Sequence, residues 1–173
     1  LVYLLNKSFD LDYINSISIE VFSIMNDFDK LTASIFNNSI VNDDLYTMIG
    51  VGALGSQVIN LFARTGFGRW NLIDYDILFP HNLARHYLSR EHVGSYKAIS
   101  LAKEMNDLLN SEFAKPVNYN FLTSQKIEQI SNILKGSKYI IDISTSVGVA
   151  RSLARDFDEE IKAPRISAFL NPS

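Results

Sequence analysis

The spacing of apolar residues changes repeatedly along residues 45–173. Apolar runs of strand length alternate with segments of helical period; the runs are 45–51, 70–74, 117–122, 138–144 and 165–170, and the helical segments are 53–67, 95–110, 124–135 and 147–161. Such alternation predicts a mostly parallel sheet, because parallel strands need crossover connections and helices usually supply them. We therefore predict an α/β fold, a Rossmann-like, mostly parallel sheet with helices on both faces.

Residues 1–44 have a different pattern. The run "LVYLLNKSFDL" is compatible with a strand, residues 17–36 place apolar side chains on a broad helical face, and the Asn/Asp-rich residues 37–44 are typical of a loop. We expect a helical lead-in that packs on the sheet of a second unit, residues 45–173. The alternative is that residues 1–44 are the tail of a preceding domain.

A glycine-rich turn separates the first predicted strand from the first predicted helix of this unit. Gly50, Gly52 and Gly55 form the pattern G-x-G-x-x-G in "IGVGALGS". The first glycine permits a tight turn, the second lets the backbone approach a phosphate, and the third allows close packing of helix and strand. A turn that binds no ligand is the alternative, but the strand-to-helix placement favours a nucleotide site.

Asp74 ends the second predicted strand, where a carboxylate that binds a ribose hydroxyl belongs. A helix cap or a solvated turn residue is the alternative for an acid at this place. Up to this point a dehydrogenase that binds NAD(P) fits the sequence as well as an enzyme that uses ATP.

The polar residues that follow favour phosphate chemistry. Asp76, Asn82, Arg85 and Lys97 form a larger polar set than a dinucleotide reductase needs. Cationic and amide donors stabilise the charge that develops when an α-phosphate is attacked. A carboxylate that binds Mg²⁺ usually accompanies them, and Asp142, at the end of "KYIID", is our candidate. Each residue taken alone is about as compatible with a structural role.

Residues 45–155 resemble the ThiF/MoeB/ubiquitin-activating family, on "GVGALGS", "LIDYD", "NLARH", "VGSYKA" and "YIIDIST" in the family's order. The resemblance implies a nucleotide-binding domain that uses ATP and Mg²⁺ to adenylate the C-terminal carboxylate of a ubiquitin-like or sulfur-carrier protein, and that assembles as a homodimer. It also implies roles for single residues: ribose binding by Asp74, phosphate binding by Asn82 and Arg85, charge stabilisation at the α-phosphate by Lys97, and magnesium binding by Asp142.

Composition narrows the partners and the chemistry. The 173 residues carry a net charge of −3 with no long run of like charges, which disfavours nucleic acid as a partner. The sequence contains no cysteine, so no thioester can form on these residues, and we expect a reducing, cytoplasmic setting. No apolar run reaches the length of a membrane-spanning helix. The three histidines, His81, His86 and His92, are scattered rather than at metal-ligand spacing, so with no cysteine we assign no zinc site.

The function we predict is ATP-dependent adenylation of a carrier protein. An NAD(P)-binding oxidoreductase domain and a catalytically inactive ThiF-like scaffold subunit are the alternatives. The chain begins at Leu1 rather than Met and stops shortly after an apolar run. We therefore expect it to be part of a longer protein, truncated at its C-terminus.

Overall fold

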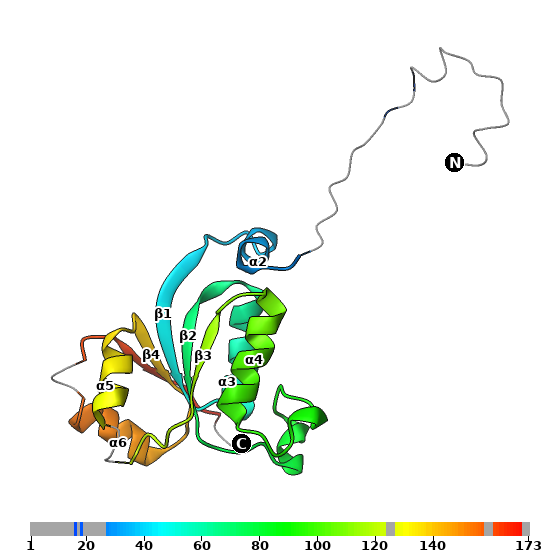
Figure 1. Cartoon of the computed structure of the whole chain (residues 1–173). Helices are drawn as coiled ribbons and strands as arrows, with labels where there is room; N and C mark the ends of the chain where they lie inside the picture. The colour runs from blue at the N-terminus through cyan, green and yellow to red at the C-terminus, as the bar shows by residue number, and fades with distance from the viewer. Residues whose placement is uncertain (1–15, 17, 19–26, 124–126, 158–160, 171–173) are drawn as a thin grey trace.

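The chain folds around one sheet of five parallel strands in the order β3-β2-β1-β4-β5 (Figure 1). The computed structural model describes residues 16, 18, 27–123, 127–157 and 161–170. The strands are β1 (Asn42–Ile49), β2 (Phe67–Ile73), β3 (Ala114–Val117), β4 (Tyr139–Asp142) and β5 (Arg165–Ser167). The predicted α/β class and the parallel sheet are confirmed.

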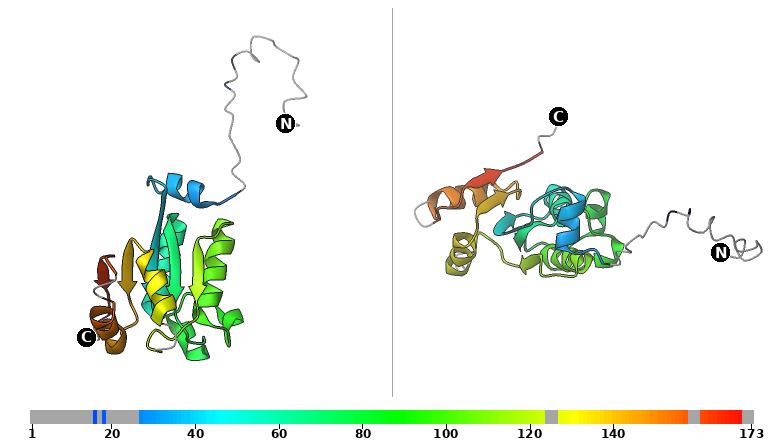
Figure 2. Two further views of the ribbon diagram at one scale, coloured as in Figure 1. Left: turned by 60° about the vertical axis from the view of Figure 1, so that its left-hand side comes forward. Right: turned by 90° about the horizontal axis from the view of Figure 1, so that it is seen from above.

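Helices cover both faces of this sheet (Figures 1 and 2). The α-helices are α2 (Lys30–Phe36), α3 (Ala53–Arg64), α4 (Lys97–Leu109), α5 (Ile127–Lys135) and α6 (Val147–Arg155). Two short 3₁₀ helices, η1 (Pro80–Ala84) and η2 (Arg90–His92), lie between β2 and α4. Within the described residues, no helix has the length and apolar character needed to cross a membrane.

An aromatic cluster packs α3 against one face of the sheet. Tyr46 of β1 stacks on Trp70 of β2 with ring centroids 5.0 Å apart, and Phe62 of α3 stacks on Trp70 at 4.6 Å. The indole N–H of Trp70 donates to the Phe67 carbonyl, so this buried ring has no unpaired polar group. Aromatic pairs contribute about 0.5–1.5 kcal/mol each beyond the area that they bury. The cluster therefore fixes α3, whose first turn forms part of the site described below.

The second face has its own apolar core, which α5 and α6 cover. Ile49 and Ile73, the last residues of β1 and β2, are buried there together with Ile140 of β4. Ile130 of α5 and Leu153 of α6 pack on them. Burying such an aliphatic side chain contributes about 1.5–3 kcal/mol. Because the central strands are buried on both faces, their residues are nearly all apolar, which explains the continuous apolar runs in the sequence.

The strand order reverses at β1. The chain runs from β1 to β2 and β3 on one side, and then passes back across β1 to β4 and β5 on the other. At such a reversal the loops after the two central strands leave in opposite directions, and a crevice opens outside the carboxyl ends of the strands. The glycine turn follows β1 at this point.

Part of the predicted lead-in forms α2, which lies over the amino ends of β1 and β2 in Figure 1. Its N-cap Asp29 accepts a hydrogen bond of 2.7 Å from the Thr32 N–H, and Lys30 forms an ion pair with Asp43 of β1. Ala33 is buried in the same core cluster as Tyr46. The predicted helix over 17–36 is too long, because residues 27–29 are not helical, and the predicted loop over 37–44 is too long, because β1 begins at Asn42. Residues 1–15, 17 and 19–26, which hold the possible strand and the start of the predicted helix, lie outside the described residues.

The observed bounds of all five strands differ from the predicted ones, by a few residues for β1, β2 and β4 and by more for β3 and β5. The prediction of a strand over 117–122 is wrong: β3 ends at Val117, where that strand was to begin. Val117 is buried as the last residue of β3, whereas Phe121 is buried in the same apolar cluster from the loop that follows, so the alternation beyond Val117 comes from a loop. The last predicted strand, 165–170, is also shorter, since β5 ends at Ser167 and Phe169 is exposed.

Gly55→Ala tests the close contact between α3 and β1. An added Cβ at Gly55 would collide with the Gly50 carbonyl oxygen, whereas one at Gly52 meets no atom within 4 Å. Alanine favours a helix by up to about 1 kcal/mol over glycine, but overpacking against backbone costs about 1–3 kcal/mol. We expect Gly55→Ala to lower the free energy of unfolding by more than Gly52→Ala, whose cost is limited to that of a poorer helix N-cap, about 0.5–1 kcal/mol. Equal denaturant midpoints for the two variants would contradict this account.

Candidate functional site

The glycine turn brings the end of β1 against the segment that follows β4. Gly50 has a φ of +88°, and a Cβ built on it would lie 2.6 Å from the Ser144 Cα. A side chain at this position is therefore excluded by backbone conformation and by space. The Gly50 N–H donates to the Ile73 carbonyl at 2.8 Å, which continues the β1–β2 ladder into the turn.

The N-terminus of α3 points its first amides at the crevice. Gly52 is the N-cap and offers no side-chain hydrogen bond to them. Free N–H groups and the positive end of the helix dipole favour an anion at this place. Because a Cβ at Gly52 would meet no protein atom within 4 Å, packing does not require glycine here. The missing side chain leaves open space at the start of α3, which is available to a ligand.

A first cavity of about 260 Å³, the strand-end cavity, lies at the carboxyl ends of β1 to β4. Gly50 and Gly52 form one wall, and Asp74 and Asp76 another. The remaining wall combines apolar and polar residues of the loops after β3 and β4 with one residue of α6; they are Tyr119, Asn120, Phe121, Leu122, Ile143, Ser144, Ser146 and Val149. Apolar surface beside hydroxyl and carboxylate groups suits a flat base joined to a sugar.

Asp74 is tied to the glycine turn. Its Oδ2 accepts a hydrogen bond of 2.8 Å from the Val51 N–H, and its Oδ1 accepts one of 2.8 Å from the Asp76 N–H. Burial raises the pKa of Asp74, and these two N–H donors partly oppose that effect. A carboxylate has about four acceptor positions, so Asp74 can still accept from a ligand hydroxyl.

A second cavity of about 280 Å³, the lysine cavity, shares Gly52 with the strand-end cavity. It is lined by Gly52, Ala53, Asn82, Arg85, His86, Lys97 and Leu170. Pockets for small molecules usually measure about 300–1,000 Å³, so either cavity alone is small for a nucleotide. The two linings have Gly52 in common.

Lys97, the first residue of α4, is buried in the wall of the lysine cavity. Its Nζ lies 2.9 Å from the Asp76 Oδ2, and its backbone N–H donates to the Asp76 carbonyl at 2.9 Å. Asn82 accepts the Phe79 N–H through its Oδ1 at 2.9 Å, which leaves the amide nitrogen to donate into the cavity. Arg85 is exposed at the rim.

His86 belongs to this site, although the sequence gave it no role. It is buried, its Nε2 lies 2.8 Å from the Val51 carbonyl oxygen, and its Nδ1 accepts the Leu88 N–H at 3.0 Å. Since Nδ1 accepts, Nε2 carries the proton and donates to Val51. Burial lowers the pKa of His86 and the charge of Lys97 lowers it further, against the opposing hydrogen bond to Val51.

Asp142 ends β4 beside Ile49 of β1, at the level of the glycine turn. Its side chain is buried, and its Oδ1 accepts hydrogen bonds from the Ser144 N–H at 3.0 Å and the Ser144 hydroxyl at 2.6 Å. Among the described residues that line the two cavities, Ser144 is present and Asp142 is not. Its assignment to magnesium stays a prediction.

The structure thus divides the predicted site residues into three groups. Gly50, Asp74 and Asp76 line the strand-end cavity, and Asn82, Arg85 and Lys97 line the lysine cavity, with Gly52 common to both. Gly55 lies behind the turn and permits the close approach of α3, and Asp142 lies behind Ser144.

A parallel sheet with a glycine turn at its topological switch point defines a Rossmann-like domain. The chain belongs to the ThiF family, whose model matches residues 41–157. This confirms the resemblance seen in the sequence.

Named relatives are similar over part of their length. The ATP-dependent ubiquitin transferase-like protein Cap2 of Enterobacter hormaechei is 33% identical over 107 residues, 62% of this chain and 18% of Cap2. The adenylyltransferase and sulfurtransferase MOCS3 of Xenopus laevis is 32% identical over 122 residues, 70% of this chain and 26% of MOCS3.

A similar solved structure is E. coli tRNA N6-threonylcarbamoyladenosine dehydratase, TcdA, in complex with ATP. Its TM-score is 0.59 and its sequence identity 27%, over 72% of this chain and 50% of that chain. The chain therefore spans half of that structure, and smaller shares of Cap2 and MOCS3.

The buried, neutral His86 predicts a dependence of stability on pH. A histidine with a lowered folded-state pKa binds a proton more readily in the unfolded chain, where its pKa is about 6.5. Its effect is absent well above that value, and stability falls as pH decreases through and below it. We expect the melting temperature to drop more for the wild type than for His86→Gln between about pH 7.5 and pH 5.5.

Glutamine suits this test because its amide can donate to Val51 and accept from Leu88. The matched control is His81→Gln, since His81 is exposed on η1; it should keep the pH dependence of the wild type. Parallel curves for wild type and His86→Gln, measured by differential scanning fluorimetry, would show that His86 carries no part of the acid sensitivity.

Proposed function

We propose that this chain is an adenylating domain that binds ATP·Mg²⁺ and activates the C-terminal carboxylate of a ubiquitin-like or sulfur-carrier protein. Membership of the ThiF family supports nucleotide chemistry, and the names of Cap2 and MOCS3 support a ubiquitin-like or sulfur-carrier pathway. TcdA, whose structure is similar, was crystallised with ATP.

The observation that carries the proposal is the meeting of two unlike cavities at Gly52. The strand-end cavity has the apolar walls and the Asp74 carboxylate that a nucleoside requires, and the lysine cavity has the cations and the amide that phosphates require. Gly52 between them has open space in place of a side chain, beside the free amides of α3. In this proposal the triphosphate runs past Gly52, from the strand-end cavity to the lysine cavity.

In the proposed reaction, a carboxylate oxygen of the carrier attacks the α-phosphorus of ATP and the bond to pyrophosphate breaks. An acyl adenylate and pyrophosphate result, and no proton needs to be transferred between carboxylate and leaving group. The task of the chain is to hold the ribose at Asp74 and to stabilise charge with Asn82, Arg85 and Lys97. Fixed donors are most effective in a site with little water, and Lys97 is the most buried of these cations.

Magnesium would be held chiefly by phosphate oxygens and water, as this ion prefers, with one carboxylate from the protein. Asp142 suits that part because Ser144 occupies only its Oδ1. The cation would supply further neutralisation of phosphate charge. Ser144 lines the strand-end cavity and donates to Asp142, so we expect the cation to bind Asp142 from the side of that cavity, directly or through a water molecule.

The name of TcdA supports a second candidate, a dehydratase that acts on a modified tRNA nucleoside. The net charge of −3 and the acidic residues at the strand ends favour a carrier protein over tRNA. Two further parts of the proposal concern setting: a homodimer, which is the commonest soluble assembly, and the cytoplasm. Adenylate formation that requires tRNA and no carrier protein would favour the second candidate.

Calorimetric titration with ATP·Mg²⁺ and with NADH tests the choice of nucleotide. We expect the wild type to prefer ATP·Mg²⁺, and preference for NADH would favour an oxidoreductase domain. In Gly52→Ala the added methyl group enters space proposed for phosphate, at a cost of about 1–3 kcal/mol. The Kd for ATP should therefore rise about 10- to 100-fold, with a smaller loss of stability than Gly55→Ala causes. Unchanged affinity would exclude the junction of the cavities as the phosphate site.

Lys97→Ala tests charge stabilisation during the reaction. If Lys97 contacts the α-phosphate, its charge matters most as pyrophosphate departs, so kcat should fall more than ATP affinity. Losing one preorganised donor costs about 10²–10³ in turnover. The measurement is carrier-dependent exchange of labelled pyrophosphate into ATP by the full-length protein. Lys103→Ala on the same helix is the control, because Lys103 is exposed and forms its ion pair with Asp107 on the helix surface. Equal exchange by both variants at saturating ATP would overturn the role of Lys97.

A further inference from the structure

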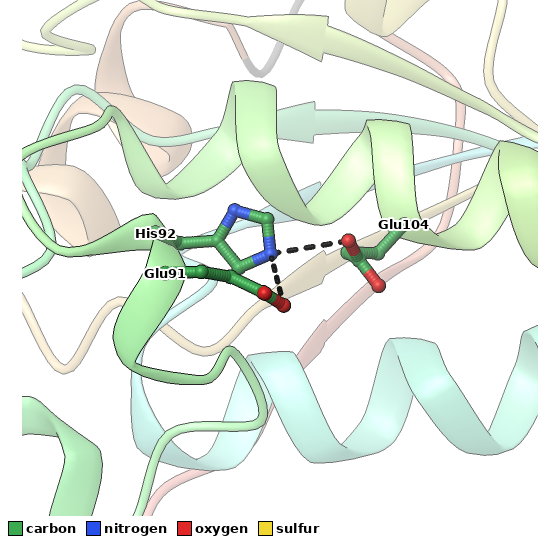
Figure 3. Close-up of side chains that lie close together, drawn as sticks. All are labelled: Glu91, His92 and Glu104. Atoms are coloured by element: carbon green, nitrogen blue, oxygen red, sulfur yellow. Dashed lines mark hydrogen bonds and ion pairs between the residues drawn. The ribbon is translucent and has the colours of Figure 1, made fainter.

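A group of three metal-ligating side chains lies away from both cavities, where η2 packs against α4 (Figure 3). Glu91 and His92 belong to η2 and Glu104 to α4, and in Figure 3 the three point toward one another. The His92 Nε2 lies 3.1 Å from the Glu104 Oε1 and 3.7 Å from the Glu91 Oε1. The three ligand atoms all lie within 4.8 Å of one another, and among the described residues no second group of three such side chains does so.

The spacing of these atoms matches a small tetrahedral coordination shell. Zinc binds histidine nitrogen at about 2.0–2.1 Å and carboxylate oxygen at about 2.0–2.2 Å. Two donors at the tetrahedral angle are then about 3.3–3.6 Å apart. The two nitrogen–oxygen distances, 3.1 and 3.7 Å, lie on either side of that range. The three donor atoms all lie within 4.8 Å of one another, so binding one cation requires them to draw closer by rotation of the side chains.

The arrangement also leaves charge unbalanced in the absence of a cation. One imidazole nitrogen carries at most one hydrogen, so the Nε2 of His92 cannot donate fully to two carboxylates at once. Side-chain exposure is 15% for His92 and 35% for Glu104, so this pair is partly shielded from water. Ser89 donates to the Glu91 Oε1 at 2.9 Å and orients that acid toward the histidine. Such hydrogen bonds to ligands are typical of metal sites.

We propose that Glu91, His92 and Glu104 bind a divalent transition-metal ion, best Zn²⁺, with water completing the shell. An imidazole with two carboxylates suits zinc, whereas Mg²⁺ prefers oxygen ligands alone. The bound ion joins η2 to α4 across the segment that leads into Lys97, the first residue of α4. It therefore stiffens the approach to the lysine cavity without contacting a ligand there.

The competing occupant is a proton, which would make His92 and Glu104 a simple ion pair. Titration with ZnSO₄ of chelator-treated protein, in the presence of excess Mg²⁺ and without nucleotide, separates the two. We expect saturable binding of one Zn²⁺ and a rise in melting temperature for the wild type. Excess Mg²⁺ competes for sites made of oxygen ligands alone, and the variants below locate the zinc ion. ATP·Mg²⁺ binding is measured separately, so failure of this proposal leaves the proposed function unaffected.

Three variants locate the ion. His92→Gln and Glu91→Gln should lose the binding heat and the thermal shift, and Glu91 is a safe position for folding because its side chain is 74% exposed. His81→Gln, which removes an exposed histidine, should keep both. The proposal is overturned if wild-type protein shows no saturable binding, if either of the first two variants binds as the wild type does, or if His81→Gln loses binding to the same extent.

Discussion

The backbone of Val51 holds the site together. Its N–H donates to the Asp74 carboxylate and its carbonyl accepts from His86, so one residue of the glycine turn is bonded to the end of β2 and to the segment after η1. From Asp74 the connection continues to the Asp76 N–H, and from Asp76 to the backbone and the ammonium group of Lys97. A shift of the turn would therefore move the walls of both cavities together.

This network contains charges that the fold keeps only because each has a partner. A buried lysine costs free energy unless an anion or hydrogen bonds compensate. Asp76 supplies that compensation at 2.9 Å, and its own side chain remains 53% exposed. If a phosphate replaces Asp76 as the partner of the Lys97 ammonium group, the Asp76 carboxylate can be solvated by water at a small cost in free energy. A partner that is itself buried would make the same exchange expensive. The pair is thus compatible with a lysine that changes partners during a reaction.

The sequence predicted the features that depend on local rules. The glycine turn, the acid after β2 and the order of strands and helices follow from spacing and from backbone sterics, and the sheet class is confirmed. The bounds of β3 failed because Tyr119 and Phe121 alternate like strand residues while they belong to a loop over the core. The role of His86 was missed because its partners are backbone groups of Val51 and Leu88, which no sequence pattern marks.

The grouping of Glu91, His92 and Glu104 was missed for a related reason. The spacing of the histidines along the chain shows no metal-ligand pattern. Glu104 comes from the next helix and meets His92 only after η2 packs on α4. The direction in which η2 faces α4 depends on tertiary packing, which a single sequence does not specify.

The position of Leu170 bears on how a substrate carboxylate would reach the junction at Gly52. Leu170 follows β5, lines the lysine cavity and is 71% exposed, and the neighbouring Phe169 is 68% exposed. The lining of that cavity therefore includes the apolar Leu170 after β5 and the exposed Arg85 after η1. An extended peptide ending in a carboxylate matches this combination, because its backbone and side chains could lie on the apolar Leu170 while its terminal charge is drawn toward Arg85 and Lys97. A compact anion such as free phosphate would gain nothing from the apolar Leu170, whereas the polypeptide tail of the proposed function would bury part of it.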